Sequence, residues 1–429
     1  MRLFKNADWL APDWLVGRWY ALVLGIVGTL AVTQLIGTGE DIALEPGELV
    51  IISGQDDSTG GQHQALIDQW NATHPRNPAR VIQLSPIADA AHSEMVARAQ
   101  STKPDVDIYN LDVTWTAEFA EAGYLRALDQ STVDSSAFLQ NPIKTCDYEG
   151  RLWCLPFNTN AGLLYYRTDK MPAPPGSWAQ LVRIVDSVFA DPGRDSRLLA
   201  GYAGQLARYE GLTVNALEAI HAAAPGSDVV RNGKITVELP DIKLGIERLA
   251  PSGVVLSESL DYDELGSTQA FRDGKVLFMR NWPIAYRQLT AAADDGQPDA
   301  PAVQFKVAPL PGASVLGGEN LAISAKSARP KAAQALIEFL TDARSQQILF
   351  ERGGFAATRE VVYQDAEVRR QYPYAPTLLQ AIQKAKPRPV TPCYNQFTEA
   401  FQTAVHQALS SSQQLPDDFI HTLESALKC

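Results

Sequence analysis

The stretch Leu316-Gly317-Gly318-Glu319-Asn320-Leu321-Ala322-Ile323-Ser324 is the most informative part of this 429-residue chain. Leu310-Pro311-Gly312 precedes it, and an apolar, helix-like run from Ala332 to Thr341 follows it. This order predicts a turn, a glycine-rich loop, a strand and an amphipathic helix. Neither glycine has a Cβ, so the backbone at 317 and 318 can approach another group closely.

The composition is that of a globular protein, with 45% hydrophobic and 20% charged residues. The chain is too long for one ordinary hydrophobic core, so we expect two domains. The formal net charge of −12 argues against nucleic acid or an anionic membrane surface as the main partner. Acidity of this kind also keeps an exported protein soluble, and it indicates no function by itself.

The N-terminal segment predicts export. Trp19 to Ile36 holds eighteen residues without a formal charge, the lower limit for a spanning helix. Basic residues precede this run and acidic residues follow it, so the positive-inside rule places the rest of the chain outside the membrane. We therefore expect a cytoplasmic segment at 1–18, a membrane segment at 19–37 and a linker at 38–47.

Two interpretations of the segment at 19–37 remain open. One is a signal peptide cut near Gly39, where the small-residue cleavage pattern is poor. The other is an uncut signal anchor, which we favour because Trp19 and Tyr20 lie at its cytoplasmic edge like an aromatic belt. Lipid anchoring is excluded because no cysteine lies near the end of the segment.

Four cysteines, Cys146, Cys154, Cys393 and Cys429, suggest two disulfides in an exported protein. Three pairings are possible. The segment from Cys146 to Cys154 resembles a β-hairpin that turns at Glu149-Gly150, which would place these two cysteines opposite each other. Cys393 and Cys429 would then tie the C-terminal tail to an upstream loop. No C-x-x-C pair and no nearby histidine supports a metal site.

Strand and helix signals alternate after the linker. Short apolar runs predict strands at 49–53, 81–84 and 106–112, and periodic segments between and after them predict helices at 65–73, 88–100 and 114–121. This order indicates an α/β lobe with a mainly parallel sheet. A strand follows at 163–166, and a second region from about 168 to 305 is richer in helices and loops. A long helix follows Pro330 to about Glu351, and the last is expected at 397–410.

Seven short motifs occur in an order that resembles the sugar-type extracellular solute-binding proteins (family 1) of ABC importers. The resemblance is to the trehalose/maltose-binding branch and covers about residues 48–410. The motifs run from Asp112 to Ala120, Tyr148 to Pro156, Gly162 to Arg167, Ala270 to Pro283, Leu310 to Gly312, Gly317 to Asn320 and Arg388 to Tyr394. Each alone is unspecific, but their shared order is specific.

The resemblance implies a two-lobed α/β fold of the periplasmic-binding-protein type II, with three hinge crossings near 157–162, 306–312 and 340–346. Lobe 1 would hold 48–158 and 312–342, and lobe 2 would hold 162–306 and 346–429. The lobes would close around a ligand, and the permease would recognise the closed form. The expected protein is a monomer that binds a carbohydrate, an oligosaccharide or polyol, on the outer face of the cytoplasmic membrane, anchored there or secreted.

A sugar site needs side chains that bond hydroxyls and flat rings that cover apolar C–H faces. Asp112 lies at the carboxyl end of a predicted strand, where open α/β sheets bind ligands, although it can also cap the helix that follows. Asn160 matches a polar position of the family or is a turn residue. The other candidates are matched to the family's pocket or to strand-terminal loops: Gln55, Asp56, Glu264, Trp282, Tyr286, Gly317, Gly318 and Arg388.

Each of these candidates also has a structural interpretation. Trp282 is the best stacking candidate, but an indole ring is also common in a core. Glu264 and Arg388 can be solvated surface residues, and the glycine pair can form a plain tight turn. Glu319 is a departure from the family, because many relatives have Trp in this place. The lost ring and added charge put a disaccharide ligand in doubt and make a more polar or cationic ligand conceivable.

The chain carries no recognisable catalytic motif. G-x-S-x-G, the P-loop, G-x-G-x-x-G and H-E-x-x-H are all absent from the sequence, and the six histidines have no metal spacing. We therefore expect no enzyme activity, no metal and no cofactor. An extracellular carbohydrate-active enzyme that uses Asp112 and Glu264 remains a weak alternative. A second alternative is a binding component that signals to a membrane sensor.

Overall fold

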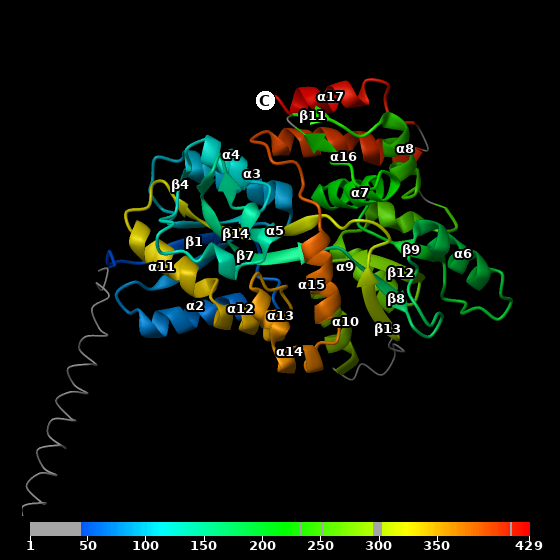
Figure 1. The fold of residues 1–429 in the computed structure, drawn as a ribbon, viewed down its shortest axis with the longest axis horizontal. Coiled ribbons are helices and arrows are strands. Elements are labelled where there is room, and N and C mark those ends of the chain that lie inside the picture. The colour runs from blue at the N-terminus through cyan, green and yellow to red at the C-terminus, as the bar shows by residue number, and fades with distance from the viewer. Residues whose placement is uncertain (1–43, 232, 251, 295–302, 412–413) are drawn as a thin grey trace, which may run out of the picture. The chain divides into compact units, whose positions relative to one another are not determined.

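The computed structural model of the protein describes residues 44–231, 233–250, 252–294, 303–411 and 414–429 (Figure 1). No helix formed by these residues is long and apolar enough to cross a membrane. The predicted membrane segment at 19–37, its cytoplasmic flank at 1–18 and most of the linker at 38–47 lie outside the described residues.

The first sheet has six strands in the order β2-β1-β3-β14-β4, and β7 also pairs with β14. Its parallel part consists of β1 (Leu49–Ser53), β2 (Ala79–Gln83) and β3 (Ile108–Asp112). Helices α2 (Gln62–Thr73) and α3 (Ala88–Gln100) connect these strands. All five residues of β1 are buried, which fits a parallel strand covered on both faces. The predicted strand-helix alternation is therefore confirmed.

The glycine-containing strand β14 (Leu316–Ser324) completes the first sheet. It runs antiparallel to β3, to the short β4 (Leu125–Arg126) and to β7 (Cys154–Ala161). The expectation of a mainly parallel sheet is therefore wrong: the sheet is mixed, because a strand from much later in the chain enters it in the opposite direction. In this register Glu319 lies opposite Asp112, and Gly317 lies opposite Asn160. Residues far apart in the sequence thus meet at one edge.

The second sheet has the order β13-β8-β12-β9. Its strands are β8 (Leu163–Arg167), β9 (Ala200–Ala203), β12 (Val276–Asn281) and β13 (Phe305–Pro309). Only β9 and β12 are parallel neighbours, while β8 is antiparallel to both β12 and β13. Two small two-stranded sheets lie apart: β5 (Asp147–Tyr148) with β6 (Arg151–Leu152), and β10 (Val230–Arg231) with β11 (Lys234–Ile235).

Three chain segments lie side by side where the sheets adjoin. The first is Gly162, between β7 and β8, whose N–H donates to Ser314 Oγ at 2.6 Å. The second is 310–315, between β13 and β14. The third contains Lys386, which exchanges backbone hydrogen bonds of 2.8 Å with Ser314 and Leu316.

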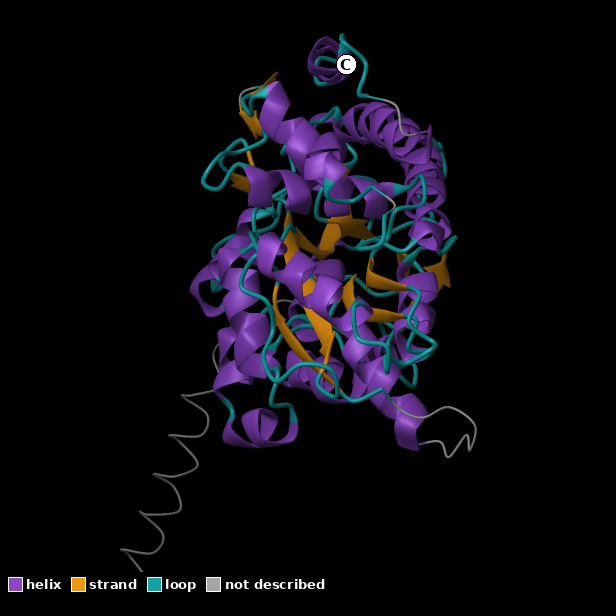
Figure 2. Ribbon diagram, turned by 90° about the vertical axis from the view of Figure 1, so that its right-hand side faces the viewer, coloured by secondary structure: helices purple, strands orange, loops and turns teal. Residues whose placement is uncertain are grey.

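Helices surround both sheets, and strands lie inside (Figure 2). The helices not yet named are α4 (Thr116–Glu121), α5 (Gln140–Lys144), α6 (Trp178–Phe189), α7 (Glu210–Ala223), α8 (Leu239–Glu247), α9 (Glu264–Arg272), α10 (Ile284–Asp294), α11 (Pro330–Leu340), α12 (Ala343–Ile348), α13 (Glu360–Gln364), α14 (Ala366–Gln371), α15 (Ala375–Lys384), α16 (Tyr394–Ser411) and α17 (Phe419–Ala426). Short helical turns at Ser135–Ala137, Ser257–Asp261 and Leu349–Gly353 complete the set.

One long helix was expected after Pro330, but the structure divides it. Asp342 accepts a hydrogen bond from the Ser345 N–H and so caps a new helix, α12. The following helical turn ends as predicted at Gly354, whose φ of 80° is left-handed. Helices α16 and α17 pack with α7, α8 and β11, on the side of the second sheet (Figure 1).

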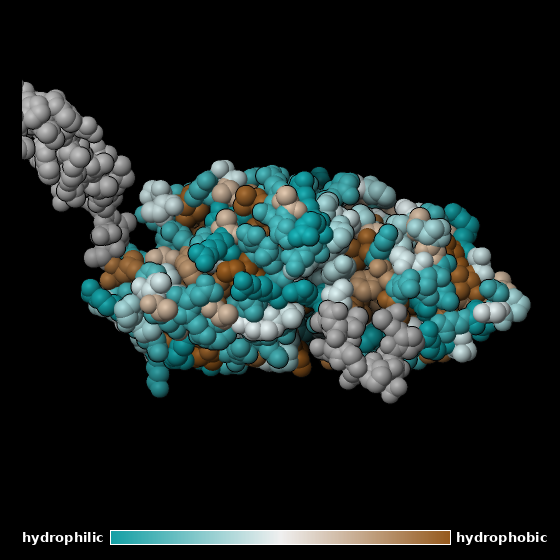
Figure 3. Space-filling model, turned by 90° about the horizontal axis from the view of Figure 1, so that it is seen from below, coloured by the Kyte–Doolittle hydropathy of each residue, from teal (hydrophilic) through white to brown (hydrophobic). Residues whose placement is uncertain are grey.

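The face of the molecule seen in Figure 3 is mostly hydrophilic, with apolar residues in small separate spots. Large apolar residues that are exposed, such as Leu265 and Val390, are few among the described residues. The apolar side chains are instead buried around the two sheets.

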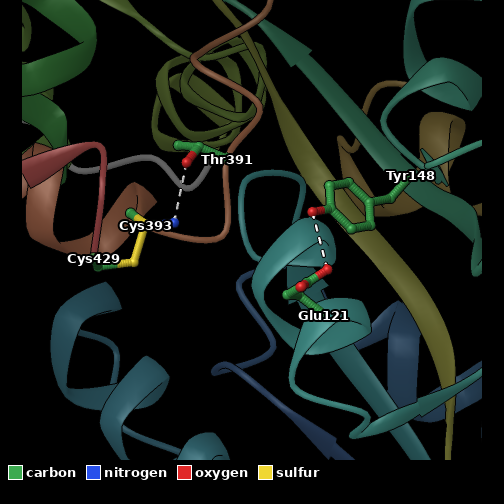
Figure 4. Close-up of a disulfide and its surroundings, with 5 residues drawn as sticks. All are labelled: Glu121, Tyr148, Thr391, Cys393 and Cys429. Atoms are coloured by element: carbon green, nitrogen blue, oxygen red, sulfur yellow. Dashed lines mark hydrogen bonds between the residues drawn. A yellow bond between two sulfur atoms is a disulfide. The ribbon is translucent and has the colours of Figure 1, made fainter. Parts of the chain in front are cut away.

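The structure corrects one of the two predicted disulfides. Cys393 and Cys429 are bonded, and they tie the end of the chain to the segment before α16 (Figure 4). Cys146 and Cys154 are free, buried thiols. Glu149 and Gly150, both with positive φ, form a two-residue turn, so Cys146 lies opposite Trp153, whose N–H donates to the Cys146 carbonyl. The register therefore offsets the two cysteines by one position, but their thiols are still neighbours: burial raises the pKa of the Cys146 thiol, and a side-chain hydrogen bond with Cys154 adds to the shift.

Candidate functional site

The ends of β3, β12 and β14 lie near one another where the two sheets adjoin. Asp112 is the last residue of β3. Both of its carboxylate oxygens accept hydrogen bonds from Nη2 of Arg388, at 2.8 and 3.1 Å. Its Oδ1 also accepts bonds from the N–H and the hydroxyl of Thr114. Asp112 therefore both stabilises the turn into α4 and holds Arg388.

Arg388 connects the two sides of the site. It is buried, and its Nη1 donates to Glu210 Oε1 at 2.8 Å. Glu210 begins α7, on the side of the second sheet, and also accepts bonds from the hydroxyls of Tyr394 and Thr398. Burial raises the pKa of Glu210, while the Arg388 charge opposes this shift. A small cavity beside Arg388 is lined by Thr114 and Leu316, among others.

Trp282 follows β12 and is partly buried. Its Nε1 donates to Glu264 Oε1 at 3.1 Å, and the Arg280 guanidinium lies 3.8 Å from the centre of its ring. The far edge of the indole faces β14: a Cβ added at Gly317 would lie 3.2 Å from Cη2 of Trp282 and 3.3 Å from Cβ of Asn160. Trp282, Asn160 and Gly317, predicted separately, thus meet at one place.

Glu264 is the first residue of α9, after the helix cap Asp263. Besides the Trp282 indole, it accepts a hydrogen bond from the hydroxyl of Tyr209 at 2.8 Å. Both donors are neutral. The Glu264 carboxylate therefore has a fixed position at one edge of the Trp282 ring.

Glu319 faces the same region from the first sheet. Its Oε2 accepts hydrogen bonds from Nδ2 of Asn110 at 2.8 Å and from Nδ2 of Asn158 at 2.9 Å. Burial raises the pKa of Glu319 to about 7; the two amides oppose this shift, and the charges of Asp112 and Asp57 add to it. A carboxyl group thus stands where the family resemblance suggested an aromatic ring.

The loop after β1 holds the predicted candidates Gln55 and Asp56, and also Asp57, which was not predicted. Asp56 accepts bonds from the N–H and hydroxyl of Ser58 and from the N–H of Gln64, so it stabilises the start of α2. Gln55 and Asp57 are exposed to solvent. Partial desolvation raises the pKa of Asp57, and the charges of Asp56 and Glu264 add to the shift, which places Asp57 within reach of the Glu264 field.

Two further candidates have clear structural contacts. The ring of Tyr286 stacks on Tyr374, with 4.1 Å between their centres, and packs with the buried cluster around the second sheet. Gly318 has a φ of 129°, and a Cβ there would lie 2.5 Å from the Asn158 carbonyl oxygen. Only glycine fits this position without strain.

The sequence did not single out Asn110, Asn158, Glu210 or Tyr209. Asn110 alternates with buried apolar residues in β3, and a polar residue inside a buried strand was the available signal. No three His, Cys, Asp or Glu side chains in the described ranges form a group able to hold a metal ion. Larger cavities open elsewhere, beside α6 and α7 and beside α8 and α16, and none of the predicted residues lines them.

Known proteins share both the sequence and the fold. The sequence model of the family described as "Bacterial extracellular solute-binding protein" matches residues 65–376. A "Probable ABC transporter-binding protein" of Deinococcus radiodurans is 31% identical over 381 residues, which cover 84% of this chain and 88% of that protein.

Solved structures give the same picture. Maltose-bound MalE3 of T. maritima has a TM-score of 0.77 at 27% identity and covers 89% of this chain and 99% of its own. A solute-binding protein of Thermotoga lettingae, bound to α-D-tagatose, has a TM-score of 0.75 at 22% identity, with 89% and 99% covered. The GacH receptor of Streptomyces glaucescens has a TM-score of 0.72 at 21% identity, with 90% and 99% covered. The last two show the fold alone.

Proposed function

This chain belongs to the bacterial extracellular solute-binding proteins, and we propose that it binds a carbohydrate between two lobes and delivers it to an ABC permease. Members of this family bind ligands and are not enzymes. The family is extracellular, which is consistent with a location outside the cytoplasm. Attachment through the segment at 19–37 and a monomeric state belong to the proposal.

The proposed lobes are built on the two sheets. The proposed connections are 157–162, 306–312 and 340–346. The first and the third lie side by side, because the Gln346 side chain donates to the Phe157 carbonyl at 2.7 Å. A further segment around Lys386 lies beside 310–315 and leads into α16. Closure would bend these connections and leave each sheet intact.

The position of Trp282 carries the proposal. Its indole lies between Glu264, on the side of the second sheet, and Gly317 and Asn160, on the first. An aromatic ring with carboxylate and amide groups at its edges suits a sugar, because the ring covers the C–H face while the polar groups bond the hydroxyls. We assign ligand contact to Trp282, Glu264, Asn160, Gly317 and Glu319.

The other predicted residues take different places in the proposal. Asp112 and Arg388 form an ion pair at the edge of the site. They would either border the ligand or replace part of this pairing by hydrogen bonds to it. Gln55 is exposed in the loop after β1, and we propose that it contacts the ligand when the lobes close. Gly318, Asp56 and Tyr286 support the site through turn geometry, helix capping and packing.

A thermal-shift screen against sugars and polyols tests this function. The panel contains maltose, trehalose, tagatose, ribitol and longer maltodextrins, because relatives with this fold bind compounds of these kinds. A ligand at 100 times its dissociation constant should stabilise the fold by about 2.7 kcal/mol. Calorimetry then measures the affinity of each compound that raises the melting temperature. If no carbohydrate or polyol shifts it, the proposed function is wrong.

A further inference from the structure

The charges around Trp282 do not balance. Glu264, Glu319 and Asp57 take part in no ion pair among the described residues. The two nearby guanidinium groups are already engaged: Arg388 bonds Asp112 and Glu210, and Arg280 forms a two-point pair with Glu218. The site therefore holds carboxyl groups without a counter-ion. A cation beside them would favour the ionised form of Glu319, whose pKa burial raises to about 7.

Two buried amide oxygens indicate that the ligand carries a hydrogen-bond donor. Asn110 and Asn158 are 2% and 5% exposed, and both donate through Nδ2 to the same oxygen of Glu319. Their Oδ1 atoms have no hydrogen-bond partner among the residues that the structure describes. The Glu319 carboxylate fixes the orientation of both amides, because a flipped amide would turn its oxygen toward the carboxylate. These buried oxygens can only accept, so any group that reaches them when the ligand binds has to be a donor.

These groups lie at defined positions around the aromatic ring. Gly317 and Glu319 are two residues apart on β14, so both face the side on which the Trp282 edge lies. Glu264 bonds the opposite end of the indole. Asp57 lies in the loop after β1, which begins beside Glu319: a Cβ added at Gly54 would lie 3.9 Å from Glu319 Oε1. A ligand seated against Trp282 thus meets carboxylates from both sheets.

We propose that the ligand is a polyhydroxylated amine such as an amino sugar, with its protonated amine among Asp57, Glu264 and Glu319. The inference rests on the proposed function, since it specifies the chemistry of the ligand in the same site. An ammonium group supplies three N–H donors and a positive charge, which a hydroxyl does not. It pairs the carboxylates and donates to the free amide oxygens, while the sugar ring covers Trp282.

Calorimetric titration of the full chain with matched sugars tests this inference. Cellobiose, the corresponding disaccharide of glucosamine, and diacetylchitobiose share one backbone and carry hydroxyl, amine or acetamide groups. Glucose, glucosamine and N-acetylglucosamine repeat the comparison with one ring. We expect the amine to bind at least about tenfold more tightly than either neutral form, because its hydrogen bonds are charge-assisted. Added salt should weaken only the amine.

Charge-neutral variants locate the effect. Asp57→Asn and Glu319→Gln should each reduce the preference for the amine by about tenfold. Asp57 is not among the residues assigned to contact the sugar, so Asp57→Asn should also leave the neutral sugars within about threefold of their original affinity. Asp57 is exposed, so its substitution should not impair folding. Asp186→Asn removes the same charge from the exposed face of α6 and should change nothing.

Two results would overturn the inference in different ways. If a neutral sugar binds as tightly as its amine, or if both variants keep the full preference, the amine assignment is wrong and carbohydrate binding stands. If none of the six sugars binds and the broader carbohydrate panel also fails, the proposed function falls together with this inference.

Discussion

Arg388 donates to both carboxylate oxygens of Asp112, at 2.8 and 3.1 Å, and so connects the third inter-sheet segment with the end of β3. The same guanidinium bonds Glu210 of α7 at 2.8 Å. One buried cation therefore holds a carboxylate from each side of the site. Removing it would leave two carboxylates facing each other with no counter-charge.

We predict that Arg388→Ala strongly destabilises the protein. Removal of one member of a buried ion pair typically costs about 3 kcal/mol or more, because the partner charge stays buried. The comparison is Arg370→Ala, which breaks the exposed pair with Glu367 and should cost less than about 1 kcal/mol. Chemical denaturation of both variants measures the difference. Equal losses would show that the Arg388 contacts contribute no more than a surface pair.

The raised pKa of Glu319 predicts a pH-dependent stability. Burial sets the folded pKa at about 7, above the ordinary value of about 4.3 in an unfolded chain. The folded state therefore binds the proton more tightly, and this contribution to stability is full below about pH 4 and is lost as the pH rises to about 7. Four other side chains affect this carboxyl group and stay unchanged in the test: Asp112, Asp57, Asn110 and Asn158.

Glu319→Gln imitates the protonated side chain. Between pH 4 and 8 the variant should therefore gain about 3–4 kcal/mol of stability relative to the wild type, nearly all of it in that window. Melting curves of both proteins at several pH values measure the difference, and all other titrating groups cancel in the comparison. A constant difference between the two proteins across the range would contradict the raised pKa.

The two glycines of β14 should differ in their tolerance of alanine. Gly318→Ala forces a side chain onto a φ of 129° and within 2.5 Å of a backbone oxygen, so we expect a loss of about 1–3 kcal/mol. Gly317→Ala meets only the side chains of Trp282 and Asn160, which can shift. It should preserve the melting temperature and weaken ligand binding. If Gly317→Ala were less stable than Gly318→Ala, the structural role assigned to Gly318 and the ligand-contact role assigned to Gly317 would be wrong.

The thiol content provides a further test. Alkylation of the unfolded, unreduced protein should label two cysteines, Cys146 and Cys154, and reduction should release two more. Cys429→Ser opens a loop with a sequence separation of 36, which should cost about 4 kcal/mol by chain entropy. Melting under oxidising conditions measures that loss. No label before reduction would mean that Cys146 and Cys154 are also bonded.

Local pattern predicted much of this fold. The strand at 49–53 and the helix at 88–100 were predicted with the bounds that the structure has. Apolar periodicity within a few residues determines such elements, so the sequence shows them directly. The break between α11 and α12 at Asp342 was not predicted. Aspartate is a common residue at the start of a helix, and Asp342 accepts a hydrogen bond from the Ser345 N–H there.

The site was only partly predictable, because its contacts join distant positions. Asp112 and Arg388 were both candidates, but their pairing spans 276 positions in the sequence. Glu210 and Asn158 could be assigned to the site only from the structure, where Glu210 bonds Arg388 and Asn158 bonds Glu319. The hairpin error at Cys146 had a different cause: a two-residue turn and a longer turn give the same pattern but shift the register by one.

The most direct test of the site is a titration of the best-binding carbohydrate into the wild type, Trp282→Ala and the control Trp153→Phe. Trp153 is a partly buried indole that contacts Arg151 and the Tyr148 carbonyl, away from the site. We predict that Trp282→Ala binds at least about tenfold more weakly, because it loses the stacking face, while the control binds like the wild type. Equal affinities for all three proteins would contradict a ligand seated on Trp282 between the two sheets.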